Sequence, residues 1–156
     1  MYEAKQTGRN KVVISNKGIK RELQTLKIAV VDDDPIIRSM LSQVLSKISP
    51  PRHFKIEIKT FYDGLTFLKS EWITDDCYYV VVLDGMMPKM DGLEVLQKLR
   101  QERRQDKFTV MMLTTRKSEA DIKRALQLGA DDYMTKPFKL VEIESRVQRL
   151  MNKVKS

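Results

Sequence analysis

The chain has 156 residues, which suits one domain with a substantial core and leaves little room for a second. Hydrophobic residues make up 42% and no apolar run is long enough to span a bilayer, so membrane insertion is excluded and a cytoplasmic globular protein is expected. The net charge of +8 raises nucleic acid as a partner.

The distribution of that charge argues against direct nucleic-acid binding by this chain. Through Lys27 there are seven basic residues against two acidic ones, a balance of +5, so most of the excess lies in a polar leader. We predict that residues 1–25 form a basic, partly disordered N-terminal extension, and that residues 26–156 form the folded domain. The single cysteine, Cys77, excludes an intrachain disulfide and fits a reducing compartment.

Five strands, each followed by a helix, are predicted from Leu26 onward. Apolar runs predict strands at residues 26–31, 78–83 and 108–113. Alternation of apolar and charged residues predicts a strand at 54–61, and a short fifth strand is predicted at 132–135. Apolar residues at helical spacing predict helices near 35–48, 63–72, 92–105, 119–128 and 140–154. Asp34 and Ser118 are suited to cap the first and fourth helices, and Gly129 to end the fourth. In the fourth helix, Ile122, Ala125 and Leu126 are expected to pack inward.

The polarity of the strands predicts their order. The first, third and fourth are apolar throughout, which is typical of strands covered on both faces. The second alternates between apolar and charged residues and the fifth is short, so both are expected at the edges. These features predict an α/β fold of the flavodoxin-like (βα)5 type, with a central parallel five-stranded sheet in the order 2-1-3-4-5.

Polar residues follow the strands at what would be one edge of that sheet. Asp32 and Asp33 follow the first strand, and Asp84 follows the third. In the order 2-1-3-4-5 these two strands are neighbours and bound the crevice where open α/β sheets bind ligands. Thr114 follows the fourth strand, and Lys136 follows the fifth. We therefore expect the three carboxylates to meet, with a hydroxyl and an ammonium group beside them.

Three close carboxylates repel one another, and a hard cation such as Mg²⁺ relieves the repulsion with oxygen ligands. Lys136 and Thr114 are then suited to neutralise the oxygens of a phosphoryl group carried on a carboxylate. The sequence has no glycine-rich phosphate loop with its lysine, which argues against a nucleotide substrate.

Four motifs resemble the receiver domain of bacterial two-component response regulators. They are "AVVDDDP", "VVLDGMMPKMDG", "VMMLTT" and "GADDYMTKPF", in the order and at the spacing of that family, and the resemblance covers about Leu26 to Asn152. It implies a phosphorylation-controlled signalling switch of a two-component system, with a sensor histidine kinase or a phosphotransfer protein as partner. It also implies a cis Lys136-Pro137 bond.

The resemblance also implies a role for each site residue. Asp84 would be the phosphoacceptor, with Lys136 holding a phosphoryl oxygen. Mg²⁺ would be bound by the carboxylates of Asp33 and Asp84, by the backbone carbonyl of Met86, and by Asp32 through water. Thr114 and Tyr133 would be the switch residues. Beyond self-catalysed phosphoryl transfer and autodephosphorylation, no enzyme activity is expected.

Two alternative functions stay open at this stage. An Mg²⁺-dependent phosphatase working through an aspartyl phosphate would typically carry a second acid two residues beyond Asp84, where this chain has Met86. The chain is also consistent with the receiver fragment of a longer regulator that binds DNA or makes a nucleotide messenger. A homodimer through the surface of the fourth helix, fifth strand and fifth helix is the expected output of phosphorylation, with Arg146 among its charged residues.

Two features of the loops around Asp84 bear on its expected reactivity, and the first departs from the pattern of the receiver family. Gly85 stands where a side chain is common and is expected to give the acceptor loop unusual freedom. Met86 and Arg116, two positions beyond Asp84 and Thr114, are expected to flank the phosphoryl group and to hinder attack by water.

Overall fold

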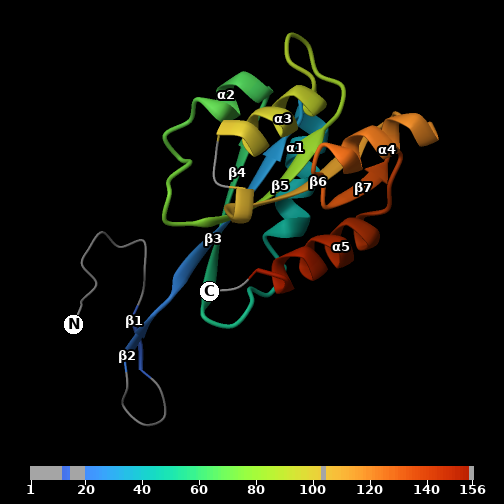
Figure 1. The fold of residues 1–156 in the computed structure, drawn as a ribbon. Helices are drawn as coiled ribbons and strands as arrows, with labels where there is room; N and C mark the ends of the chain where they lie inside the picture. The colour runs from blue at the N-terminus through green and yellow to red at the C-terminus, as the bar shows by residue number, and fades with distance from the viewer. Residues whose placement is uncertain (1–11, 15–19, 103–104, 155–156) are drawn as a thin grey trace.

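A computed structural model of the chain describes residues 12–14, 20–102 and 105–154. A parallel sheet forms its centre, with helices on both faces (Figure 1). The strands of this sheet are β3 (Gln24–Val31), β4 (Phe54–Phe61), β5 (Tyr78–Asp84), β6 (Phe108–Thr114) and β7 (Asp132–Thr135). The helices are α1 (Pro35–Leu45), α2 (Gly64–Leu68), α3 (Gly92–Glu102), α4 (Glu119–Gln127) and α5 (Leu140–Asn152), with a 3-10 turn at Gln105–Lys107. The predicted strands and helices are confirmed, with α2 shorter than expected.

The strand order is β4-β3-β5-β6-β7. Counted from β3 this is 2-1-3-4-5, so the predicted flavodoxin-like order is confirmed. The alternating strand β4 and the short strand β7 lie at the edges, as their sequences indicate. Val31 of β3 is paired with Leu83 of β5, and this register places the residues that follow, Asp32 and Asp84, side by side at the carboxyl end of the sheet.

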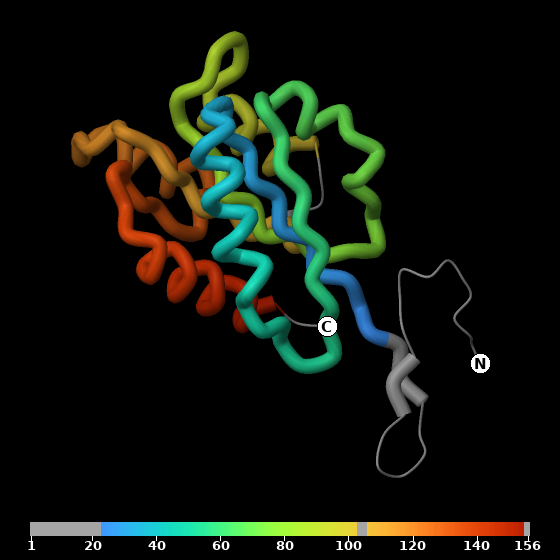
Figure 2. The backbone as a smooth tube through the Cα atoms, turned by 180° about the vertical axis from the view of Figure 1, so that it is seen from behind, coloured from blue at the N-terminus to red at the C-terminus, as the bar shows by residue number. Residues whose placement is uncertain are grey.

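Two separate apolar cores explain why the central strands are hydrophobic on both faces. On one face, the side chains of Tyr79, Val81 and Leu83 pack with α2, α3 and α4. On the other face, Val80 and Val82 pack with α1 and α5. Figure 2, seen from behind, shows α1 and α5 on this second face. The sheet is therefore held between two layers of helices, and only its edges and strand ends are open to ligands.

The inward face of α4 differs from the expected one. Ala125 is fully buried and Ile122 is half-buried, but Leu126 is 48% exposed. Successive residues of a helix are about 100° apart, so a helix that points Ala125 at the sheet turns Leu126 toward solvent. The predicted burial of Leu126 is therefore wrong, and an apolar side chain remains on the surface of α4.

The predicted N-terminal extension falls largely outside the described residues. Within it, β1 (Val12–Ile14) pairs antiparallel with β2 (Lys20–Glu22), away from the main sheet (Figure 1). The first strand of the main sheet begins at Gln24, two residues before the predicted boundary at Leu26. The disorder predicted for the leader and the exact domain boundary stay predictions. In the described part of the chain, no helix is long and apolar enough to cross a membrane.

Candidate functional site

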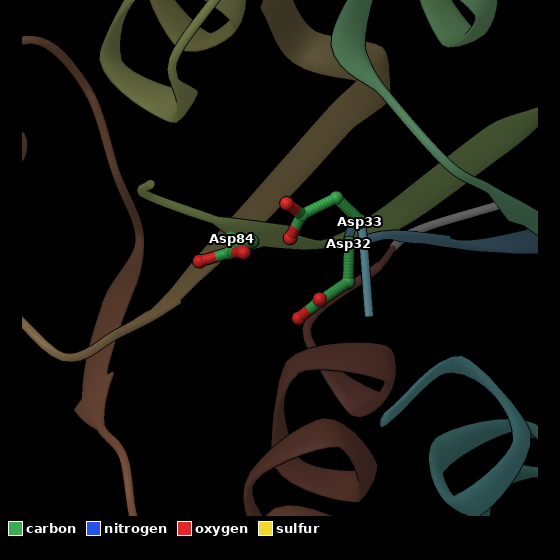
Figure 3. Close-up of side chains that lie close together, drawn as sticks. All are labelled: Asp32, Asp33 and Asp84. Carbon is green, nitrogen blue, oxygen red and sulfur yellow. The ribbon is translucent and has the colours of Figure 1, made fainter. Parts of the chain in front are cut away.

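Three carboxylates meet where β3 and β5 end. Oxygen atoms of Asp32, Asp33 and Asp84 all lie within 4.8 Å of one another. Asp32 and Asp33 extend from the end of β3 toward Asp84 at the end of β5 (Figure 3). Asp32 and Asp84 are buried, with 2% and 4% of their surface exposed, whereas Asp33 is exposed. The predicted acidic cluster therefore forms, with one of its members open to solvent.

The turn from β3 into α1 fixes the position of Asp32. The backbone amide of Asp34 donates to Oδ1 of Asp32 at 2.9 Å, and Asp34 itself caps α1 by accepting from the amide of Ile36. The guanidinium of Arg38 donates to the backbone carbonyl of Asp32 at 2.8 Å. Sequence reasoning missed Arg38, although its position in the first turn after three aspartates is the kind of signal that places a cation beside them.

The loop from β5 to α3 is closed on itself around Asp84. The backbone amide of Met86 donates to Oδ1 of Asp84 at 3.1 Å, and the amide of Gly92 donates to the carbonyl of Gly85 at 3.1 Å. A Cβ atom at Gly92 would lie 2.3 Å from the carbonyl oxygen of Asp84, which no real Cβ can do. Gly92 is therefore required because the start of α3 passes directly against the backbone of Asp84, a role that the Asp91-Gly92 sequence alone did not reveal.

Gly85 has a different role from the one predicted. Its φ lies outside the positive range, so its backbone does not need the freedom of glycine. A Cβ atom there would instead lie 2.7 Å from Oγ1 and 2.8 Å from Cβ of Thr114. Gly85 therefore provides the space in which the Thr114 side chain packs against the loop that follows β5.

Lys136 bridges the two buried carboxylates. Its Nζ lies 2.9 Å from Oδ2 of Asp32 and 3.5 Å from Oδ1 of Asp84. Burial lowers the pKa of Lys136, but the hydrogen bond and the charge of Asp32, together with Asp84, outweigh that effect and raise it overall. The predicted meeting of the ammonium group with the carboxylates is thus present in the structure.

The pKa of Asp84 is raised to about 6. Burial is the main cause, and the charges of Asp32 and Asp33 add to it, whereas the amide of Met86 and the ammonium of Lys136 oppose it. A carboxylate with this pKa is costly to ionise in the protein alone. A divalent cation at the cluster would lower that cost, because it favours the ionised form of every carboxylate that it contacts.

The donor set fits Mg²⁺. Three carboxylate oxygens lie within 4.8 Å of one another, and carboxylate oxygens are the hard ligands that Mg²⁺ prefers. Mg²⁺ in proteins usually keeps several water ligands, and the exposed Asp33 leaves the cluster open to solvent. The structure brings the backbone of Met86 to the cluster through its amide. The carbonyl of Met86 as a metal ligand, and Asp32 as a ligand through water, stay predictions.

Thr114 and Tyr133 are connected through Arg116. The backbone amide of Arg116 donates to Oγ1 of Thr114 at 3.3 Å, and the hydroxyl of Tyr133 donates to the carbonyl of Arg116 at 2.9 Å. Thr114 is buried, and Tyr133 is half-buried against the core that contains α3 and α4. The end of β6 is thereby linked to the edge strand β7. The bond between Lys136 and Pro137 is cis, as expected.

Comparison with known proteins identifies the family. Residues 28–148 match the family model of the response regulator receiver domain. The chain belongs to the receiver family. It is 39% identical over 81% of its length to the alkaline phosphatase synthesis transcriptional regulatory protein PhoP of Bacillus subtilis, and 39% identical over 86% of its length to the probable transcriptional regulator ycf27 of Cyanophora paradoxa. It spans only 49% and 52% of those relatives, about half of each.

Solved receiver structures agree with this assignment. The BeF3-activated receiver domain of DrrB is 34% identical, with a TM-score of 0.65 over 80% of this chain and 96% of that one. The response regulator DrrB of Thermotoga maritima, an OmpR/PhoB homolog, is 33% identical with a TM-score of 0.70, covering 85% of this chain and 55% of that one. This receiver domain is therefore a phosphorylation-controlled switch of two-component signalling, a class that works with histidine kinases or phosphotransfer proteins.

Proposed function

We propose that Asp84 accepts the phosphoryl group, with Mg²⁺ bound by Asp33, Asp84 and the carbonyl of Met86, and with Asp32 acting through water. The observation that carries this proposal is the position of Asp84. It is the buried carboxylate at the end of the central strand β5, clustered with two other carboxylates and 3.5 Å from the ammonium group of Lys136. Asp32 is also buried, but both of its carboxylate oxygens are engaged, Oδ2 by Lys136 and Oδ1 by the amide of Asp34. In Asp84, Lys136 and the amide of Met86 both contact the same oxygen, Oδ1.

In the proposed reaction, a carboxylate oxygen of Asp84 attacks the phosphorus of a phosphohistidine on the partner. The new O–P bond forms as the N–P bond breaks, and the electron pair stays on the imidazole. Lys136 neutralises charge on the phosphoryl oxygens, and the hydroxyl of Thr114 donates a charge-assisted hydrogen bond to one of them. Mg²⁺, held by Asp33, Asp84 and the carbonyl of Met86, would further neutralise the charge of the phosphoryl group. Transfer of this kind depends mainly on positioning and charge, which the cluster provides.

The experiment is incubation with a small acyl phosphate and Mg²⁺, followed by intact-mass measurement. Wild type should gain one phosphoryl group, and a chelator should abolish the gain. Asp84→Asn should stay unlabelled, whereas Asp91→Asn, in the same loop but outside the cluster, should label like wild type. Equal labelling of Asp84→Asn and wild type would refute the assignment.

The alternative function as an aspartyl-phosphate phosphatase lacks support at the site. Such an enzyme needs an acid two residues beyond the acceptor to serve the leaving group. Met86 occupies that place, with its side chain 49% exposed and its amide bound to Asp84. We therefore propose that the chain accepts a phosphoryl group and acts as a switch, and that it is not a phosphatase.

For the output, we infer that phosphorylation promotes a homodimer through the face of α4, β7 and α5. The apolar side chain of Leu126 is 48% exposed on α4, where a shallow groove is lined by Ile122 and Leu126. Tyr133, linked to Thr114 through Arg116, lies in the strand between these helices. Relatives of about twice this length are transcriptional regulators, so a longer protein would use such a dimer to pair two DNA-binding segments.

One charged residue has to be reassigned within this dimer proposal. Arg146 already donates to Asp132 at 3.0 Å and to Glu142 at 3.2 Å within the same chain. Its guanidinium therefore helps to hold α5 against β7, and its replacement would disturb the monomer as well as any contact between copies. The exposed apolar residues are the sharper test of the interface.

A further inference from the structure

Two loops meet through one contact beside the acceptor. Met86 lies in the loop after β5, and Thr115 lies in the loop after β6. The hydroxyl of Thr115 donates to the sulfur of Met86 at 3.1 Å. Both side chains are exposed, so this contact is a bridge across the surface rather than part of a packed core.

The bridge restricts a side chain that would otherwise move freely. Met86 is fixed at its backbone, because its amide donates to Oδ1 of Asp84. The side chain of an exposed methionine is flexible, because it is unbranched and has three rotatable bonds. A bond from the hydroxyl of Thr115 selects those conformers in which the side chain reaches from the acceptor loop to the end of β6. There it lies between the two loops that flank Asp84 and Thr114.

We propose that Thr115 is a positioning residue that holds Met86 as a cover over Asp84 and thereby slows hydrolysis of the aspartyl phosphate. This inference rests on the proposed function, since it needs a phosphoryl group on Asp84. In hydrolysis, the oxygen of a water molecule attacks phosphorus opposite the Asp84 oxygen. The new O–P bond forms as the bond to Asp84 breaks, the electron pair returns to the carboxylate, and the proton of the water passes to solvent. An apolar side chain held across that approach lowers the fraction of time in which water can align.

The two exposed partners allow a clean double-mutant cycle. Thr115→Val keeps the shape of the side chain and removes the donor, and Met86→Leu keeps an apolar side chain and removes the sulfur. Each protein is labelled with acyl phosphate, and the excess acyl phosphate is then removed. Thr115→Val should lose its phosphoryl group roughly two- to tenfold faster than wild type, the range expected for loss of one hydrogen bond. In the Met86→Leu background the same change should have no further effect. Thr115→Ser, which keeps the hydroxyl, should decay like wild type.

Intact-mass time courses separate the possible outcomes, and thermal unfolding shows that each variant is folded. An unchanged decay rate in Thr115→Val would overturn the inference, and so would equal acceleration with and without the methionine, because the hydroxyl would then act without Met86. If wild type takes up no phosphoryl group, the proposed function fails and this inference fails with it. Labelling of wild type with unaltered decay in Thr115→Val overturns the inference alone.

Discussion

At the scale of single residues, Asp84 is a position where the ionised carboxylate that the proposed reaction needs lowers the stability of the fold. Its carboxyl group is 4% exposed and its pKa is raised to about 6, mainly by burial. The folded state therefore binds this proton more tightly than the unfolded state does. Below the ordinary pKa of an aspartate the carboxyl group is protonated in both states and does not reduce the free energy of unfolding. As the pH rises through about 6 the buried group ionises, and the free energy of unfolding falls.

We predict that Asp84→Asn stabilises the metal-free protein near neutral pH. The amide removes the cost of a buried negative charge but can still accept from Met86, so the gain should be on the order of 2 kcal/mol at pH 8 and close to zero at pH 4. Urea unfolding in the presence of a chelator at the two pH values measures it. The exposed Asp33→Asn is the matched control, with a smaller gain. A variant that is no more stable than wild type at pH 8 would show that Asp84 carries no such cost.

Magnesium should reverse the same penalty. If Mg²⁺ binds only the folded cluster, it should raise the free energy of unfolding by about 2.7 kcal/mol at a hundred times its dissociation constant. The gain should shrink as the pH falls below about 6, because Asp84 must lose its proton to bind the ion. Thermal unfolding with and without millimolar Mg²⁺ tests this. An equal shift in wild type and in Asp33→Ala would place the ion elsewhere.

At the scale of elements, the strands, helices and caps were predictable because their signals are local. The cap of α1 at Asp34 and the cap of α4 at Ser118 both form as the sequence indicates. The fit of Gly85 against Thr114 and the bond from Arg38 to Asp32 were not predictable, because they depend on how one loop approaches another. No periodicity or cap encodes that distance. The residues of the site followed from the strand ends, but the reasons for the glycines beside them did not.

The fit between the end of β6 and the loop that follows β5 gives a prediction at this scale. Gly85→Ala places a methyl group 2.7 Å from Oγ1 of Thr114, and we expect a destabilisation of about 1–3 kcal/mol, typical of overpacking. Thr114→Ala removes the nearest atom, so the penalty of Gly85→Ala should be smaller in that background.

Chemical denaturation of the four proteins of this cycle measures the coupling between the two sites. The prediction fails if Gly85→Ala is as stable as wild type, or if its penalty is the same with and without the Thr114 hydroxyl. Unchanged stability would mean that Thr114 does not occupy the space left by Gly85. An equal penalty in both backgrounds would mean that the Cβ atom of Thr114, 2.8 Å from the added methyl group, makes the clash and that the hydroxyl does not.

At the scale of the whole molecule, the dimer proposal predicts an effect of surface changes on one face alone. With a beryllofluoride mimic and Mg²⁺, wild type should dimerise at roughly tens of micromolar, the range of weak interfaces. Leu126→Arg should stay monomeric, because it puts a charge into the exposed apolar patch of α4. Ile36→Arg, at a 68% exposed apolar residue on α1, is the matched control and should dimerise like wild type.

Sedimentation with and without the mimic measures this. A wild type that remains monomeric would remove the homodimer as the output. A Leu126→Arg variant that dimerises like wild type would place the interface away from α4. In the first case, a partner of different sequence would have to recognise the face that Tyr133 shares with α4 and α5.

The order of the sheet was predictable from polarity, because edge strands and central strands bury different faces. The surface of the molecule was harder to predict. Leu126 was expected inside and is exposed, and Arg146 was expected to meet a second copy and is paired within the chain. Both depend on the rotation of a helix against the sheet, which a short apolar pattern does not fix to within one residue.

The most direct test of the central claim is to locate the phosphoryl group by chemical trapping. Borohydride reduces an aspartyl phosphate to homoserine with loss of phosphate, and peptide mass mapping then reads the position of the change. Homoserine at position 84, formed only after treatment with acyl phosphate and Mg²⁺, is the predicted result. Homoserine at position 32 or 33 with position 84 unchanged would contradict the assignment of Asp84 as the acceptor.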